Sequence, residues 1–302
     1  MELLSALPGA VAQGLIWGVM AIGVYITYKI LDIADLTVDG SICTGATVCA
    51  MLMINGVPVW LALIAAALSG ILAGALTGAL HILLGIPAIL SGILTQLVLW
   101  SVNLKIMGKA NQPLSARNYA VLLSQMDIPM SIVILLICAV LLVTLLYLFF
   151  GTELGAGIRA TGINPAMSRA QGINTNVTKL IGLALSNGIV AFSGALLCQY
   201  QGYADINMGK GAVVIGLAAV VIGEAVISKL PPNFAIRLSG VMVGAVIYYI
   251  VYQIIIFAGL DTDLLKLLSA LVVALFLALP YWKKKYIVKP VKRGGAQNVG
   301  SK

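Results

Sequence analysis

Long apolar stretches separated by short polar connections most constrain how this chain can fold. A helix needs about 20 mostly apolar residues to cross the hydrocarbon core of a bilayer. Charged residues make up only 9% of the 302 residues, whereas soluble domains carry about 25%. We therefore expect an all-α polytopic membrane protein with about nine transmembrane helices, within a range of about eight to ten. The predicted spans are 8–29, 37–55, 58–83, 86–106, 128–149, 180–201, 211–228, 237–259 and 263–281.

A basic tail follows the last span. We divide the chain into a transmembrane domain, 1–281, and a tail, 282–302. The tail has no interleaved aromatic residues beyond Trp282 and Tyr286, so we expect it to meet anionic lipid headgroups in the cytoplasm and not nucleic acid. The basic residues after the last span are Lys283, Lys284, Lys285, Lys289, Lys292, Arg293 and Lys302.

The distribution of basic residues predicts the orientation. Cytoplasmic loops of membrane proteins are enriched in Lys and Arg. With the C-terminus inside and nine spans, thirteen basic residues fall inside and five outside. We therefore expect the N-terminus outside, although without the tail the balance is only six to five. The five outside are Lys105, Lys109, Arg117, Lys210 and Lys266.

Three spans are short, polar, and interrupted by Gly or Pro: the second, the fourth and the seventh. Irregular backbone is tolerated at membrane depth only where it is buried in protein or lines a water-filled cavity. We therefore expect polar side chains of the second span and of the Pro-broken fourth span to line a translocation path. Hydrogen bonds between packed helices are an equally good interpretation. The candidate path residues are Ser41, Thr44, Thr95, Gln96 and Asn103.

A carboxylate within a span indicates a structural or functional role, because inserting a charged group at the bilayer centre costs roughly 2.5–3.5 kcal/mol. We expect Asp35 and Asp39 to cap the second span near the cytoplasmic interface; shaping the path, or bonding a broken helix, is the alternative for Asp39. Glu224 is expected to pair with a basic loop residue, and a proton relay is the alternative. Tyr200, Tyr203 and Trp100 fit an interfacial aromatic belt or contacts to an aromatic cargo.

Small residues and cysteines within the spans are expected to serve packing. Gly70, Gly74 and Gly78 share one helical face, which favours close packing within the chain over a contact between chains. Cys43, Cys49, Cys138 and Cys198 have no metal-binding spacing, so we expect them to act as small hydrophobic residues and expect no metal site.

The connection 151–179 contains a short helix with both ends encoded. Asn164 is a favourable N-cap residue, because its side chain accepts a bond from a free backbone N–H. Pro165 suits the first helical position, and Gly172 suits the left-handed residue beyond the end. A helix this short is not stable alone in water, so we expect a docking partner to hold it.

This connection carries a resemblance to a known family. The run 157–174, GIRATGINPAMSRAQGIN, resembles the cytoplasmic coupling loop of ABC importer permeases of the branched-chain amino acid and ribose group. Ser168 stands where that pattern often has Ala. The run 35–41, DLTVDGS, and the run 86–96, IPAILSGILTQ, are similar to early segments of the sugar permeases. The run 264–275, LLKLLSALVVAL, looks most like a subgroup linked to tryptophan and tyrosine uptake.

The resemblance implies a permease subunit that translocates a small polar solute, an amino acid, and its last stretch, 264–275, implies an aromatic one. Its implied partners are a second copy of the chain, an ATPase subunit that binds the ATP, and an extracellular substrate-binding lipoprotein, all at a bacterial inner (cytoplasmic) membrane. By the same resemblance, the coupling residues are Arg159, Ala160, Thr161, Gly162, Asn164, Pro165, Arg169 and Gly172.

Other functional classes fit the sequence less well. No G-x-x-x-x-G-K-[ST] motif is present, so any ATP hydrolysis must come from a partner. One histidine and the lack of HExxH or GxSxG motifs argue against an intramembrane enzyme, so no catalytic residue and no cofactor are expected. An ion-coupled secondary transporter is the remaining alternative; only Glu224 and Asp39 are candidates for its intramembrane carboxylates, and no internal repeat is evident.

Overall fold

The computed structural model describes residues 2–115, 119–228 and 233–257, together with single positions between 267 and 278. Helices make up nearly all of the described secondary structure. They are α1 (Glu2–Tyr25), the π-helix η1 (Ile26–Ile30), α2 (Val38–Ile54), α3 (Val59–Leu83), α4 (Ala88–Met107), α5 (Ile128–Gly151), α6 (Glu153–Ile163), α7 (Pro165–Ala170), α8 (Thr175–Gln201), α9 (Ala212–Ile227) and α10 (Phe234–Phe257). Two short strands, β1 (Asn111–Pro113) and β2 (Tyr203–Asp205), pair antiparallel.

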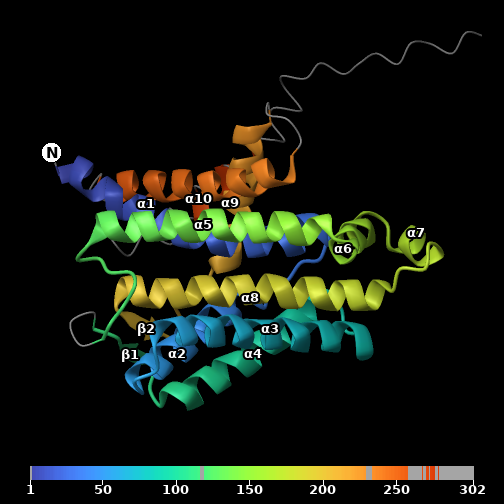
Figure 1. The fold of residues 1–302 in the computed structure, drawn as a ribbon, viewed down its shortest axis with the longest axis horizontal. Coiled ribbons are helices and arrows are strands. Elements are labelled where there is room, and N and C mark those ends of the chain that lie inside the picture. The colour runs from blue at the N-terminus through green and yellow to red at the C-terminus, as the bar shows by residue number, and fades with distance from the viewer. Residues whose placement is uncertain are drawn as a thin grey trace, which may run out of the picture.

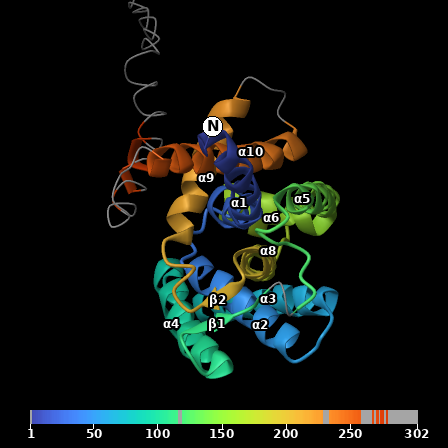
Figure 2. The ribbon, with the colours of Figure 1, turned by 90° about the vertical axis from the view of Figure 1, so that its left-hand side faces the viewer.

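The bundle has two ends of different character. In Figure 1 the long helices run side by side, with α6 and α7 at one end and β1 and β2 at the other. We call these the α7 end and the β end. Figure 2 looks along the bundle from the β end and shows α8 between the α1–α5–α10 group and the α2–α3–α4 group. The core therefore lies around α1 and α8.

The described helices agree with the predicted helical membrane architecture. Six are long and apolar enough to span a bilayer, and two apolar helices, α2 and α9, are shorter. They correspond to the first eight predicted spans. The ninth predicted span, 263–281, and the tail, 282–302, lie largely or wholly outside the described residues.

Small residues let α8 approach its neighbours closely. A side chain at Gly70, Gly74 or Gly78 of α3 would collide with the backbone or side chains of α8. The predicted packing role of this glycine face within the chain is confirmed. On another side of α8, Ser186 Oγ donates to the Gly23 carbonyl and Ser193 Oγ to the Ile16 carbonyl, both at 2.7 Å. These bonds tie α8 to α1 through most of the bundle.

α2 and α9 both begin inside the bundle. The backbone 31–37, which is neither helix nor strand, leads from η1 to Asp35, whose Oδ2 accepts from Asn187 Nδ2 near the middle of α8, at 2.7 Å. α2 then runs toward the β end, where Gln199 Nε2 donates to Cys49 Sγ at 3.6 Å. α9 starts beside the first turn of α2 and crosses the bundle, since Figure 2 shows it lengthwise, and its Glu224 reaches Lys29 of η1.

The predicted break in the fourth span is wrong. Pro87 lies at the N-cap position of α4, where its fixed φ and missing N–H are tolerated, and α4 continues for 20 residues. The second and seventh spans are short, as predicted, since α2 has 17 residues and α9 has 16.

Candidate functional site

Two helices occupy the connection in which the sequence indicated one. Thr152 Oγ1 accepts from the Gly155 N–H at 3.3 Å and caps α6. Asn174 Oδ1 accepts from the N–H groups of Asn176 and Val177 and caps α8, which therefore begins five residues before the predicted start at 180. The N-cap residues Thr152 and Asn174 were readable in the sequence as start signals.

The predicted short helix is present as α7. Asn164 Oδ1 accepts from the N–H groups of Ala166, at 3.1 Å, and Met167, at 3.0 Å. Pro165 occupies the first helical position. The predicted N-terminal end is confirmed.

The other end of α7 closes in a Schellman motif. The N–H of Ile173 donates to the Ser168 carbonyl and that of Gly172 to the Arg169 carbonyl, each at 3.0 Å. Gly172 has φ +84°, a left-handed conformation that glycine adopts without strain. These bonds hold a six-residue helix in a defined shape although little of the protein covers it.

The surface around α7 combines apolar and cationic groups. Ile163 is 86% exposed and Met167 58% exposed, and Arg169, two residues after Met167, is exposed as well. Large apolar side chains projecting from a short polar connection mark a surface for a partner. Sequence reasoning missed Ile163 and Met167, although their position in an otherwise polar loop was a signal.

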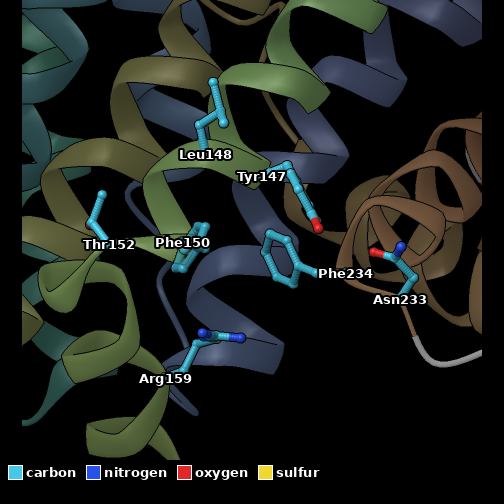
Figure 3. A pocket seen from close by; sticks show the side chains of 8 residues that line it. Tyr147, Leu148, Phe150, Thr152, Arg159, Asn233 and Phe234 are labelled. Atoms are coloured by element: carbon cyan, nitrogen blue, oxygen red, sulfur yellow. The ribbon is translucent and has the colours of Figure 1, made fainter.

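Arg159 lines a large cavity at this end. The cavity has a volume of about 780 Å³ and lies between the last turn of α5, α6 and the start of α10. In Figure 3 Phe150 and Phe234, whose ring centroids are 4.9 Å apart, lie next to each other in its lining, with Arg159 beneath them and Tyr147 above. A second cavity of about 370 Å³ shares Arg159 and Phe234 and adds Lys29 and Arg237. No carboxylate is among the described residues that line either cavity.

The other predicted coupling residues of α6 face inward. Thr161 is buried, and its Oγ1 lies 2.9 Å from Thr178 Oγ1 of α8. Gly162 packs against the Ile30 carbonyl, where any side chain would collide. Ala160 is half-buried. α6 is therefore attached directly to α8 and to the end of η1, so movement of α6 would displace the bundle.

A buried polar network joins four helices where α2 begins. Asp35 Oδ1 accepts from the Thr37 N–H at 2.8 Å, and its Oδ2 bonds Asn187 as described above. Ser41 Oγ donates to Asn187 Oδ1 at 2.6 Å. Thr77 Oγ1 of α3 lies 2.7 Å from Thr37 Oγ1 and 2.9 Å from Thr95 Oγ1 of α4. Asn187 holds this network together, and sequence reasoning did not single it out.

The network divides the five candidate path residues. Ser41 and Thr95 make hydrogen bonds between helices, the alternative considered for them. Thr44 donates to the Gly40 carbonyl of its own helix at 3.0 Å. Of these five residues, only Gln96 and Asn103 line a cavity, which is described below.

Asp39 caps a different helix from the expected one. Its Oδ1 accepts from the Val213 N–H and its Oδ2 from the Gly211 N–H, both at 3.0 Å. The expectation that Asp39 caps the second span near the cytoplasmic interface is wrong, because it caps α9 from within the bundle. Asp35 is only 6% exposed and accepts from Asn187 near the middle of α8, so it too lies inside the bundle.

A small polar cavity adjoins this junction. It has a volume of about 30 Å³ and is lined by Asp39, Gly40, Cys43, Gln96, Trp100, Asn103, Ile206 and Lys210. Asn103 is 1% exposed, and neither atom of its amide makes a hydrogen bond to a described residue. Lys210 was expected in an outer loop; instead it directly precedes Gly211, whose N–H Asp39 binds.

Glu224 pairs with a lysine, as expected. Its Oε1 lies 3.0 Å from Lys29 Nζ in an ion pair whose side chains are 36% and 45% exposed. The predicted pairing with a basic residue is confirmed. Within the described part of the chain, no three His, Cys, Asp or Glu side chains converge as metal ligands.

These features define a polytopic helical membrane protein in which two short helices meet at middle depth, an arrangement found in membrane transport proteins. The family described as "Branched-chain amino acid transport system / permease component" matches residues 7–278, and the chain belongs to this family. It is therefore a membrane permease component of a transport system and not a member of a catalytic family.

Individual relatives agree with this assignment. The chain is 40% identical over 276 residues to a tyrosine transport system permease protein of Clostridioides difficile, covering 91% of each chain. It is 33% identical over 278 residues to an uncharacterized protein of Rickettsia prowazekii, covering 91% of this chain and 97% of the relative. A xylose transport system permease protein of Haemophilus influenzae is 33% identical over 112 residues, covering 37% of this chain and 29% of the relative. No solved structure matches the chain.

Proposed function

We propose that this chain is the membrane-spanning subunit of an ABC importer. The observation that carries the proposal is α7, a six-residue helix that is capped at both ends and bordered by the exposed apolar side chains of Ile163 and Met167. Such a helix is suited to fit as a rigid unit into a groove of a separate ATPase subunit, which would bind the ATP. The α7 end is then cytoplasmic and the N-terminus outside.

The coupling residues fall into two groups under this proposal. Asn164, Pro165 and Gly172 shape α7, and Arg159 and Arg169 offer charges to the ATPase. Ala160, Thr161 and Gly162 form the second group, in which Thr161 attaches α6 to α8 and Gly162 attaches it to η1. Closure of the ATPase dimer would push α7, and α6 would pass that movement to the bundle.

The cargo is proposed to be an amino acid, and an aromatic one. The tyrosine transport named for the relative of Clostridioides difficile supports this choice. A substrate-binding lipoprotein would deliver the amino acid at the β end. A second copy of the chain would complete the path in the bacterial cytoplasmic membrane.

The rival ion-coupled secondary transporter receives no specific support. Glu224, its best candidate for a proton relay, is paired with Lys29 and partly exposed at the α7 end. Asp39 is held by two backbone N–H groups.

Purification of the native complex tests the proposal. The tagged chain, solubilised from its own membranes, should retain a nucleotide-hydrolysing subunit, and uptake in vesicles should require ATP on the α7 side. A complex without any such subunit, or uptake driven by an ion gradient alone, would contradict the proposal.

A further inference from the structure

We infer that Gln96, Asn103 and Lys210 form a site for the carboxylate of an amino acid, which a second copy of the chain completes. We call these three residues the solute cluster. The inference rests on the proposed function and names the place where the translocated solute is held. It selects Gln96 and Asn103 from the five candidate path residues and adds Lys210.

The side-chain amide of Asn103 has no hydrogen-bond partner among the described residues. An amide buried without hydrogen bonds destabilises a protein, so buried polar groups are nearly always bonded. Asn103 is 1% exposed, makes no bond to a described residue and lines the cavity beside Asp39. A group retained at such a cost to the fold is typical of functional sites.

Lys210 places a positive charge at the same cavity. It is exposed on the bundle, yet it lies beside the junction of α2 and α9 at middle depth. An ammonium group facing hydrocarbon at this depth is costly, and such residues face the interior of an assembly or a watery path. This face therefore borders water or a second copy of the chain, and not lipid.

Lys210 makes no ion pair with a described carboxylate that would neutralise it. Asp39 lines the same cavity, but its two oxygens accept from Gly211 and Val213, and no described carboxylate lies within ion-pair distance of Lys210. The ammonium can therefore bind the carboxylate of an amino acid, and the Asp39 carboxylate in the same lining favours the cationic amino group of that ligand.

The remaining lining completes the chemistry of the ligand. The amides of Gln96 and Asn103 can each donate to a carboxylate and accept from an amino group. Trp100, 46% exposed, offers an aromatic face to an apolar or aromatic side chain. The cavity of about 30 Å³ holds little more than a water, so within one chain the site is incomplete and closed.

Uptake measurements test the solute cluster. The permease and its ATPase are purified together and reconstituted in vesicles with the binding protein and radiolabelled tyrosine. Lys210→Met should lower uptake about ten- to hundredfold, the effect of losing one hydrogen bond to a charged group. Lys210→Arg should restore much of the uptake, because the charge remains. Lys105→Met, a matched change of an exposed lysine on α4, should leave uptake unchanged.

Asn103→Leu separates a ligand-binding role from a structural one. If the amide serves the solute, the variant should lose uptake while its Tm is unchanged or higher, because a buried unbonded amide has been replaced by an apolar group. A lower Tm together with lower uptake would mean that Asn103 supports the fold, and would overturn its assignment.

The outcomes distinguish this inference from the proposed function. Absence of an ATPase subunit from the wild-type complex refutes the importer. Unchanged uptake by Lys210→Met in a complex that retains its ATPase refutes the solute cluster alone. Equal losses for Lys210→Met and Lys210→Arg would refute the charge-based part of the inference.

Discussion

Asp39 Oδ1, in the first turn of α2, accepts a hydrogen bond of 3.0 Å from the backbone N–H of Val213, in the first turn of α9. The two residues are 174 positions apart. α2 extends from this point toward the β end, and α9 crosses the bundle to reach η1, where Glu224 pairs with Lys29. One carboxylate therefore connects the starts of two helices that lead to different parts of the bundle.

Asp39→Ala should lower the thermal stability of the permease. The substitution leaves the first N–H groups of α9 without their acceptor, and loss of an N-cap costs about 0.5–2 kcal/mol. Asp39→Asn keeps one acceptor oxygen and should fall between Ala and the wild type. The measurement is the Tm of the purified protein in detergent. A Tm of Asp39→Ala equal to that of the wild type would show that this bond does not stabilise the junction.

Asn187→Leu should destabilise the permease more than Ser41→Ala does. Asn187 bonds Asp35, Ser41 and the Leu183 carbonyl, so its loss leaves the buried Asp35 Oδ2 without its partner. Leaving one buried polar group unsatisfied costs about 1–3 kcal/mol. Ser41→Ala removes a single hydrogen bond, worth about 1 kcal/mol.

The order of the two Tm values in detergent is the test. A Ser41→Ala Tm at or below that of Asn187→Leu would mean that Asn187 is not the centre of the network.

Much of the helical architecture was predictable because the apolar composition of each segment indicates a membrane span by itself. Apolar length predicted eight of the described helices, and cap residues predicted both ends of α7, since Asn164 and Gly172 act within four residues of themselves. The family resemblance predicted the permease class. Each of these predictions depends on one stretch of the sequence and not on its contacts with distant stretches.

The central junction was not predictable because it depends on contacts between distant segments. Asp39 looks like a cap of its own helix, since the sequence does not show that α9 begins beside it. Asn187 looks like one polar residue in an apolar span until Asp35 and Ser41 are brought against it. Lys210 looks like a residue of an outer loop because the sequence does not show where the backbone re-enters the bundle.

Glu224→Gln should leave uptake nearly unchanged at all pH values tested. The Lys29–Glu224 pair is partly exposed, and exposed pairs contribute less than about 1 kcal/mol. Tyrosine uptake by reconstituted vesicles, followed across a pH range, is the measurement. Loss of uptake in Glu224→Gln would instead favour the secondary transporter. So would uptake that a proton gradient drives in the wild type but not in Glu224→Gln.

The proposed coupling role of α7 gives the most direct prediction for function. Asn164→Ala combined with Pro165→Gly removes the side-chain cap and the preset φ of the first helical residue, so a helix of six residues should no longer hold its shape. The variant should insert into the membrane and keep its Tm, since α7 contributes little to the core. It should nevertheless lose copurifying ATPase and ATP-dependent uptake.

Asn164→Asp is the matched control for this experiment, because a carboxylate accepts the same bonds from Ala166 and Met167. It should retain both ATPase association and uptake. Arg159→Glu changes charge at the cavity shown in Figure 3 without altering the caps, and it should also weaken association with the ATPase. If the double variant binds the ATPase as firmly as Asn164→Asp does, then α7 is not the docking element, and the exposed apolar groups at Ile163 and Met167 serve another partner.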